Sequence, residues 1–141
     1  DHDLVRFGIS RLLEDSKGIE VVGEAANGED AVTFARDHDV DVVLMDVRMP
    51  GIGGLEATRK ILRHDPNVRV IAVSALSDSS YASRIMQAGA SGFLSKGADP
   101  AEMILAIQRV SSGQKFISPE IAQSMALRSF DADQQSPFDK L

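Results

Sequence analysis

Four polar side chains stand where apolar segments of the chain end, and together they could carry out one reaction. Asp46 directly follows Val-Val-Leu-Met, while Ser74 and Lys96 each lie at the end of a later apolar segment. Asp1 opens the chain, and we expect it to follow a strand that precedes the sequence. Two carboxylates, a hydroxyl and an ammonium suit phosphoryl transfer to a carboxylate, because an aspartate can be the nucleophile while cations neutralise the donor.

This chemistry assigns each residue an expected role. Asp46 is expected to be the nucleophile, and Asp1 is expected to bind a hard cation, which takes oxygen ligands. Lys96 would neutralise charge on the donor, and the Ser74 hydroxyl would bind a phosphoryl oxygen.

Each of the four also has an ordinary structural interpretation. Asp46 could cap the turn that follows it, Lys96 could be a solvated lysine at a strand end, and the Ser74 hydroxyl could satisfy a backbone group. Asp1 could cap the first helix, for which Asp3 competes. Taken together, the four favour the phosphoryl-transfer site.

Competing nucleotide and hydrolase chemistries lack their motifs. The glycines at 51, 53 and 54 do not form G-x-G-x-x-G, since Glu56 occupies the place of the last glycine, and no P-loop spacing occurs. Phosphohydrolases with an aspartate nucleophile carry a second aspartate two residues later as acid and base, and here that residue is Arg48. A long-lived phosphoenzyme is therefore expected rather than rapid turnover.

The composition describes a globular chain of one domain. It has 141 residues, of which 43% are hydrophobic, and no cysteine, which fits a reducing compartment such as the cytoplasm. A formal net charge of −6 makes it a poor candidate for holding DNA phosphates by itself. No apolar run reaches the roughly 18 residues needed to cross a bilayer, and no signal-peptide pattern occurs.

Apolar runs alternate with helical patterns along the chain. Strands are expected at 19–25, 40–46, 68–75 and 91–96. Helices are expected at 4–14, 27–38, 54–63, 77–90 and 99–113, with another beginning at Ser118-Pro119. This alternation predicts an α/β fold with a doubly wound parallel sheet and helices on both faces. Because such a sheet normally begins with a strand, we expect a first strand before Asp1.

Two of these helices carry clear start signals. Asn27 is a suitable cap for the helix at 27–38, which has acidic residues in its first turn. The helix at 99–113 begins with Asp99 as cap, Pro100 at the first helical position and Glu102 in the first turn. Its predicted buried face consists of Met103, Ile107 and Val110.

Several segments resemble the receiver domain of bacterial two-component response regulators. They are "DHDLVR" at the start, "VVLMDVRMPGIGGLEATRKI" around Asp46, "AVSA" at 72–75 and "GFLSKG" at 92–97. "MQAGASGFLSKGA" and "ISPEIAQSMALRSF" are similar to the LuxR/NarL-type branch. The resemblance covers residues 1–113 and implies a flavodoxin-like (CheY-like) fold, here lacking its first strand. Residues 114–141 are then an extra helix and a linker toward a helix-turn-helix DNA-binding domain that the sequence does not contain.

The resemblance also implies site residues. Asp46 would accept a phosphoryl group from a sensor histidine kinase. Mg²⁺ or Mn²⁺ would be held by Asp1, Asp46 and the backbone carbonyl of Arg48. The hydroxyl, lysine and switch-aromatic positions of the family correspond to Ser74, Lys96 and Phe93. The protein would be a phosphorylation-activated switch rather than an enzyme, and it would contact DNA only through its C-terminal domain.

Two departures from the family pattern keep alternatives open. The first acid of the acidic pair and its strand are missing, and Gly97 follows Lys96 where many receivers have proline. Without a central strand, each unpaired buried backbone group costs about 1–3 kcal/mol. Either that strand belongs to the natural protein, or the chain rearranges or exchanges elements with a neighbour. The expected assembly is a homodimer, with exchange of strands or other elements as one form of it. A receiver-like domain unable to be phosphorylated and a true hydrolase are the two alternative functions.

Overall fold

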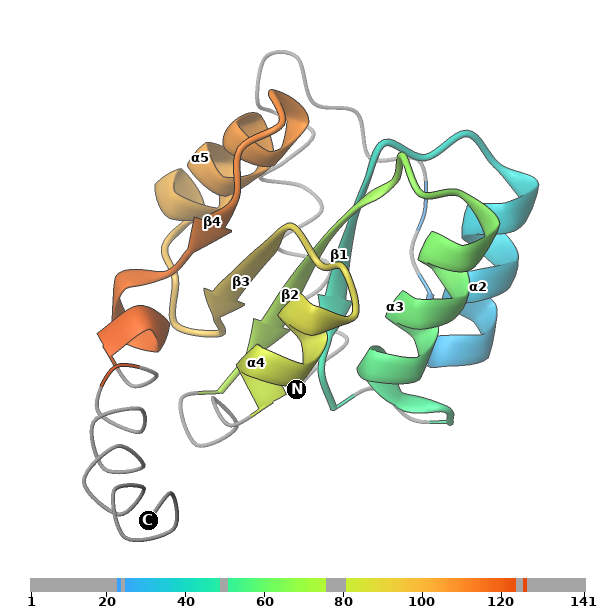
Figure 1. Ribbon diagram of the computed structural model, residues 1–141, viewed down its shortest axis with the longest axis horizontal. Coiled ribbons are helices and arrows are strands. Elements are labelled where there is room, and N and C mark those ends of the chain that lie inside the picture. Colours follow the sequence, from blue (N-terminus) through green and yellow to red (C-terminus); the bar gives the residue numbers. More distant parts are fainter. Residues whose placement is uncertain (1–22, 24, 49–50, 76–80, 124–125, 127–141) are drawn as a thin grey trace, which may run out of the picture.

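The computed structural model describes residues 23, 25–48, 51–75, 81–123 and 126. Within them, four parallel strands lie in the order β1-β2-β3-β4, as Figure 1 shows. These strands are β1 (Val42–Asp46), β2 (Arg69–Ser74), β3 (Gly92–Ser95) and β4 (Phe116–Ile117). The helices are α2 (Gly28–Asp37), α3 (Gly53–His64), α4 (Tyr81–Gln87) and α5 (Pro100–Ser111). The α/β architecture with a parallel sheet is confirmed.

Some expected elements fall outside the described residues. They are the helix at 4–14, almost all of the strand at 19–25, the start of the helix at 77–90 and the tail beyond residue 126. Gly23 and Ala25, which are described, do not belong to a strand. On the other elements the predicted and observed bounds differ by no more than a few residues at each end.

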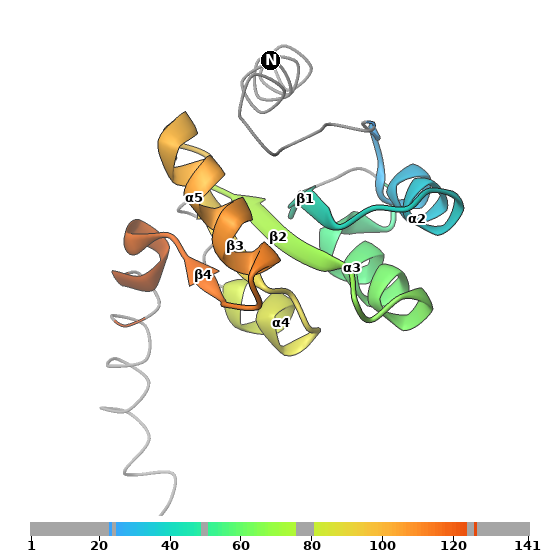
Figure 2. The ribbon, with the colours of Figure 1, turned by 90° about the horizontal axis from the view of Figure 1, so that it is seen from above.

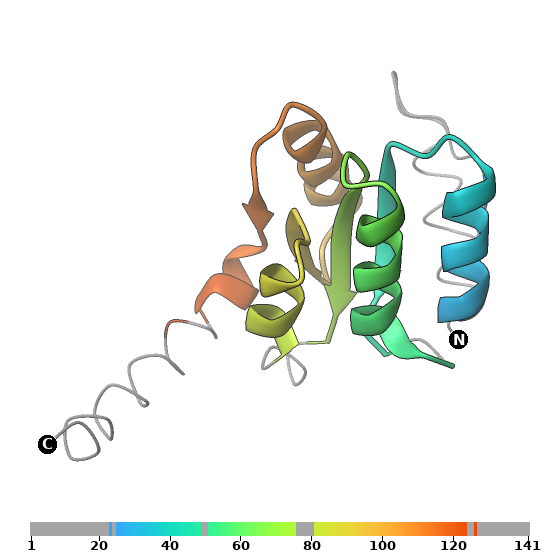
Figure 3. The same ribbon diagram turned by 45° about the vertical axis from the view of Figure 1, so that its right-hand side comes forward.

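The sheet has helices on both faces, because side chains of a strand alternate between its two sides. Met45, Val70, Ala72 and Phe93 belong to the packed cluster on the side of α3 and α4. Ile71 and Leu94 belong to a second cluster, with residues of α5. Figure 2 shows α5 on one side of the strands and α3 and α4 on the other, while Figure 3 shows α2 beside α3.

The start signals of α2 and α5 act as predicted. Asn27 Oδ1 accepts a hydrogen bond from the Asp30 N–H at 2.8 Å, and Asp99 Oδ1 accepts one from the Glu102 N–H at 2.9 Å. Pro100 stands at the beginning of α5, whose predicted face of Met103, Ile107 and Val110 is buried. In the part of the chain that the structure describes, no helix is long and apolar enough to span a membrane.

β1 is only partly buried, although its residues are almost all apolar. Met45 is fully buried, but Val42, Val43 and Leu44 are only half-buried, although they point alternately to the two faces as a doubly covered strand does. The reason is position, because among the described strands β1 pairs only with β2 and lies at the edge of the sheet.

β4 is an element that the sequence pattern does not predict. Phe116 and Ile117 pair with β3, and Ser118 then donates its N–H to the Phe93 carbonyl at 2.8 Å. The predicted helix follows at 119–123, with Ile121 completely buried, and Met125 lies outside the described residues. The packed body therefore continues past residue 113.

Candidate functional site

Asp46 and Lys96 meet at the end of the sheet where the strands terminate. Asp46 is the last residue of β1, and Lys96 directly follows β3. Their side chains form an ion pair with 3.3 Å between Lys96 Nζ and Asp46 Oδ2. The two side chains are 35% and 30% exposed, so the pair stays open to a ligand from solvent while solvent only partly screens it.

The end of β2 supports both loops that carry this pair. The Val47 N–H donates to the Val73 carbonyl at 3.0 Å, and the Lys96 N–H donates to the Ser74 carbonyl at 2.8 Å. Because β2 lies between β1 and β3, these bonds attach the first residue after β1 and the first residue after β3 to the end of β2. The backbones of Asp46 and Lys96 are thereby set at fixed positions across the sheet.

The second carboxylate oxygen of Asp46 has a partner of its own. Asp46 Oδ1 accepts a hydrogen bond from the Arg48 N–H at 3.0 Å, a local turn contact typical of aspartate. Asp46 can therefore cap the turn through Oδ1 while Oδ2 faces Lys96. The Arg48 side chain is exposed, and its Cζ lies 6.0 Å from the centre of the Tyr81 ring at the start of α4.

Ser74 ends β2 and is almost completely buried, at 1% exposure. Its Oγ donates a hydrogen bond to the Ala75 carbonyl at 2.8 Å. In this structure the hydroxyl therefore satisfies a backbone group, as the ordinary interpretation has it. To bind a phosphoryl oxygen, the Ser74 hydroxyl would have to release the Ala75 carbonyl and donate to the phosphoryl oxygen instead.

The turn that presents Lys96 depends on Ser95, which the sequence reasoning missed. Ser95 Oγ accepts a hydrogen bond from the Gly97 N–H at 3.0 Å, and the Ala98 N–H donates to the Ser95 carbonyl at 3.0 Å. A serine two residues before a glycine at a strand end is the sequence signal of such a turn. Gly97 fits without strain, since a Cβ there would meet only Ser95 Oγ, at 3.6 Å.

Phe93 is completely buried and lies in β3, the strand that Lys96 follows. It belongs to the same packed cluster as Ile85 of α4 and Ile121 of the helix after β4. Its carbonyl accepts the Ser118 N–H, so its backbone contacts the segment that follows β4. A change in the position of Phe93 would reach that segment directly.

Part of the expected cation site lies outside the described residues, because Asp1 is among those not described. Within the described ranges, no group of three or more His, Cys, Asp or Glu side chains could hold a metal. The part that is described does fit Mg²⁺, which binds one or two carboxylates and keeps several waters. Asp46 contributes a partly exposed carboxylate next to a loop that carries the Arg48 carbonyl.

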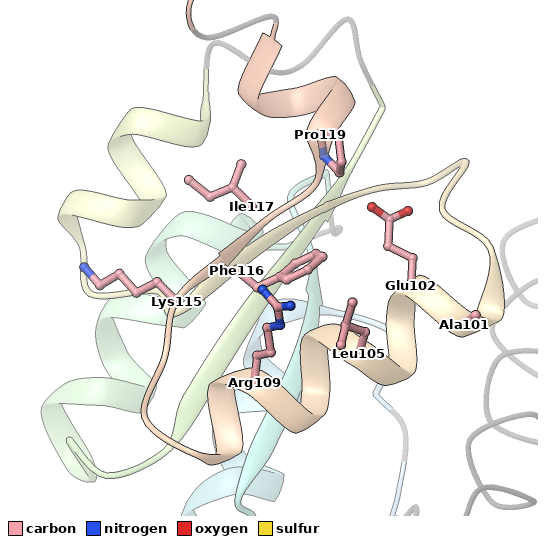
Figure 4. Close-up of a pocket in the computed structure, with 8 residues that line it drawn as sticks. All are labelled: Ala101, Glu102, Leu105, Arg109, Lys115, Phe116, Ile117 and Pro119. Carbon is pink, nitrogen blue, oxygen red and sulfur yellow. The ribbon is translucent and has the colours of Figure 1, made fainter.

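A separate groove of about 620 Å³ lies between α5 and the segment around β4. Figure 4 shows Leu105 and Arg109 of α5 reaching toward Phe116. Leu105 is 40% exposed. Asp46, Ser74 and Lys96 do not line this groove, so it is distinct from the site at the strand ends.

Comparison with known families agrees with this geometry. The model of the response regulator receiver domain matches residues 1–108. The chain belongs to this family. The receiver domain is also 55% identical over 142 residues to the response regulator GacA of Pseudomonas aeruginosa and to the response regulator UvrY of Escherichia coli K12. Both alignments cover 100% of this chain but only 66% and 65% of those proteins, so the chain spans about two thirds of their length.

A solved structure supports the same assignment for the fold. The receiver domain matches a LuxR-family two-component response regulator from Aurantimonas sp. SI85-9A1 with a TM-score of 0.85 and 40% identity. The match covers 92% of this chain and 93% of the other. The similarity to the LuxR-type branch and to the regulators GacA and UvrY is thereby confirmed.

Proposed function

We propose that this receiver domain is a phosphorylation-activated switch in which Asp46 accepts a phosphoryl group from a sensor histidine kinase. The observation that carries the proposal is the 3.3 Å contact between Lys96 Nζ and the carboxylate of Asp46 at the open end of the sheet. An aspartate that only caps a turn does not need an ammonium group from a loop on the other side of β2. An aspartate that attacks a dianionic phosphoryl donor does need such a cation, because the cation offsets the repulsion between the two negative groups.

In the proposed reaction, a carboxylate oxygen of Asp46 forms a bond to phosphorus while the bond from phosphorus to the donor imidazole nitrogen breaks. The nitrogen keeps the electron pair of that bond, and the product is an aspartyl phosphate. The Arg48 N–H holds Oδ1 and so orients the carboxylate, and Lys96 offsets the charge of the incoming phosphoryl group. Mg²⁺, held by Asp46, the Arg48 carbonyl and Asp1, would supply further neutralisation of the phosphoryl oxygens.

Phosphorylation would then change the surface of the domain. A phosphoryl group adds about −1.5 to −2 charges and three acceptor oxygens at Asp46. The Ser74 hydroxyl would leave the Ala75 carbonyl for a phosphoryl oxygen, and the loop after β2 would follow it. Phe93 would repack in response, which would bias a two-state element by local electrostatics.

We infer that the output concerns transcription, through a DNA-binding domain joined after residue 141. In the chain, the segment after β4 leads toward that expected domain; its Ser118 N–H is bonded to the Phe93 carbonyl, and its Ile121 belongs to the same packed cluster as Phe93. The expected protein partners are the sensor kinase and a second copy of the chain. Assignment to the LuxR-type branch supports this output, and the net charge of −6 argues against DNA binding by the receiver alone.

Intact-mass spectrometry tests the proposal. The chain and its Asp46→Asn variant are incubated with a small phosphodonor, such as acetyl phosphate, and Mg²⁺. We expect one added phosphoryl group in the unsubstituted chain and none in the variant. Addition to both would place the modified residue elsewhere. No addition to either, even when the chain is extended at its N-terminus, would favour an interaction domain that is not phosphorylated.

A further inference from the structure

The first turn of α2 is attached to the loop that leaves the candidate site. Glu29 Oε1 accepts a hydrogen bond from the Ile52 N–H at 2.6 Å, across a sequence separation of 23 residues. Ile52 is the last residue before α3, and the loop to which it belongs begins directly after Asp46. A carboxylate bound to a backbone N–H is a strong, charge-assisted contact.

Two glycines, Gly28 and Gly51, show how closely this loop is enclosed at its far end. A Cβ on Gly28 would lie 2.6 Å from the Ile52 side chain, so α2 and the loop can approach only because Gly28 has none. Gly51 has a φ of +84° and its missing Cβ would overlap the Glu29 carboxylate. Gly53 also has a positive φ, of +82°. The carboxylate of Glu29 therefore occupies the space that the glycine backbone leaves open.

The near end of the same loop is joined to the site. The Gly54 N–H donates to the Val47 carbonyl at 3.2 Å, which closes the loop onto the residue that follows Asp46. A Cβ on Gly54 would lie 2.5 Å from the Asp46 carbonyl oxygen, so α3 begins in direct contact with the backbone of Asp46. Arg48 lies inside this closed loop and donates its N–H to Asp46 Oδ1.

The bond from Glu29 is not needed to cap α2. The N-terminal cap of that helix is Asn27, whose side chain accepts the Asp30 N–H and donates to Asp30 Oδ2 at 3.2 Å. With the cap supplied locally, the Glu29 carboxylate is available to the loop. A glutamate in the first helical turn also favours the helix dipole, but that role would not require contact with Ile52.

We propose that Glu29 is a positioning residue for the phosphorylation site. By holding the Ile52 N–H, it fixes the start of α3, which contacts the backbone of Asp46 and Val47 and so helps to position the Arg48 carbonyl that is expected to bind Mg²⁺. The proposal rests on the proposed function for its link to Mg²⁺. The attachment of the loop by Glu29 can be tested without that link.

The experiment compares Glu29→Ala and Glu29→Gln with a matched control, Glu56→Ala. Glu56 is also a first-turn glutamate, in α3, and its nearest cation is Arg59 on the same helix, with 3.5 Å between Glu56 Oε2 and Arg59 Nη1. The control removes the same charge from a neighbouring helix start without removing a bond to the loop. The glutamine variant keeps a carbonyl oxygen that can accept the Ile52 N–H, so it should rescue most of the effect.

The first measurement is amide hydrogen exchange at Ile52, by NMR, without Mg²⁺ or phosphodonor. The second is a Mg²⁺ titration followed by the amide shifts of Asp46 and Arg48. In Glu29→Ala we expect faster exchange at Ile52 and a Mg²⁺ dissociation constant raised about tenfold, as for the loss of a group that supports a metal ligand. Glu29→Gln should fall closer to the unsubstituted chain, and Glu56→Ala should match it.

The outcomes separate the two proposals. Unchanged exchange at Ile52 in Glu29→Ala, or an equal effect of Glu56→Ala on the Mg²⁺ constant, would overturn the positioning role. Faster exchange with no change in Mg²⁺ affinity would overturn the link to the cation site. If the unsubstituted chain bound no Mg²⁺ and took up no phosphoryl group, the proposed function would fail, and the exchange data would still decide whether Glu29 holds the loop. Should Glu29→Ala not fold, the comparison of Glu29→Ser with Glu56→Ser replaces it, because serine is well tolerated in a first helical turn and lacks the carboxylate that accepts the Ile52 N–H.

Discussion

Lys96 Nζ lies 3.3 Å from Asp46 Oδ2 although β2 separates the two strands that these residues follow. The contact exists because both loops turn over the end of β2, to which Val47 and Lys96 are bonded through their backbones. An ammonium held at this distance stabilises the carboxylate in the resting protein. The same ammonium would offset the additional negative charge of a phosphoryl group bound at Asp46.

Replacement of Lys96 should therefore affect phosphorylation far more than folding. The pair is about one-third exposed, and such pairs contribute roughly 0–1 kcal/mol to stability. For Lys96→Ala we expect the rate of phosphoryl uptake to fall on the order of a hundredfold, as on removal of one group that stabilises transition-state charge. Mass spectrometry over time gives the rate, and urea unfolding gives the stability. A loss of stability of several kcal/mol would mean that the lysine is mainly structural.

The Ser74 hydroxyl can be tested by two variants of different size. Ser74→Ala removes the bond to the Ala75 carbonyl and should cost about 0.5–1.5 kcal/mol in the free energy of unfolding. We expect phosphorylated Ser74→Ala to lose its phosphoryl group faster than the unsubstituted chain, because one hydrogen bond to the phosphoryl group is missing. Ser74→Thr keeps the hydroxyl and should behave like the unsubstituted chain. Equal lifetimes in all three would remove Ser74 from the site.

Phe93 requires a mild substitution, because it is completely buried. Phe93→Ala would leave a cavity and cost about 3–5 kcal/mol, so loss of output in that variant would only report instability. Phe93→Leu leaves a smaller cavity and should cost less than Phe93→Ala. We expect this variant to take up the phosphoryl group at a normal rate and to show weaker phosphorylation-dependent DNA binding when joined to its C-terminal domain. Undiminished DNA binding would contradict the switch role.

Two glycines near the site should differ in their response to replacement by alanine: we expect Gly54→Ala to be destabilising and Gly97→Ala to have little effect. A Cβ on Gly54 would lie 2.5 Å from the Asp46 carbonyl oxygen and 2.9 Å from Val47 Cα, and both of these are backbone atoms that cannot move aside easily. Gly54→Ala should cost about 1–3 kcal/mol and displace Asp46, which lowers phosphoryl uptake. At Gly97 a Cβ would meet only Ser95 Oγ, at 3.6 Å, so Gly97→Ala is the control. Thermal unfolding and mass spectrometry measure both effects, and similar losses in the two variants would refute this account of Gly54.

The sequence alone was sufficient for elements whose signals are local. Asn27 and Asp99 cap helices because their side chains reach N–H groups three residues away, and the buried face of α5 follows from the helical period. Asp46, Ser74 and Lys96 could be placed at strand ends for the same reason. Their proximity followed once a parallel sheet was assumed, since the carboxyl ends of its strands lie on one edge.

Tertiary structure decided what local signals could not. β4 consists of Phe116 and Ile117, which are too short to show a period, and these residues form a strand only because β3 offers a free edge. Burial of Ser74 and Phe93 depends on the elements packed over them rather than on their neighbours in sequence. The bond from Glu29 to Ile52 joins residues that only the packing of α2 against α3 brings together. Short-range signals act within a few residues, whereas contacts across the sheet and between helices exist only once the whole domain has folded.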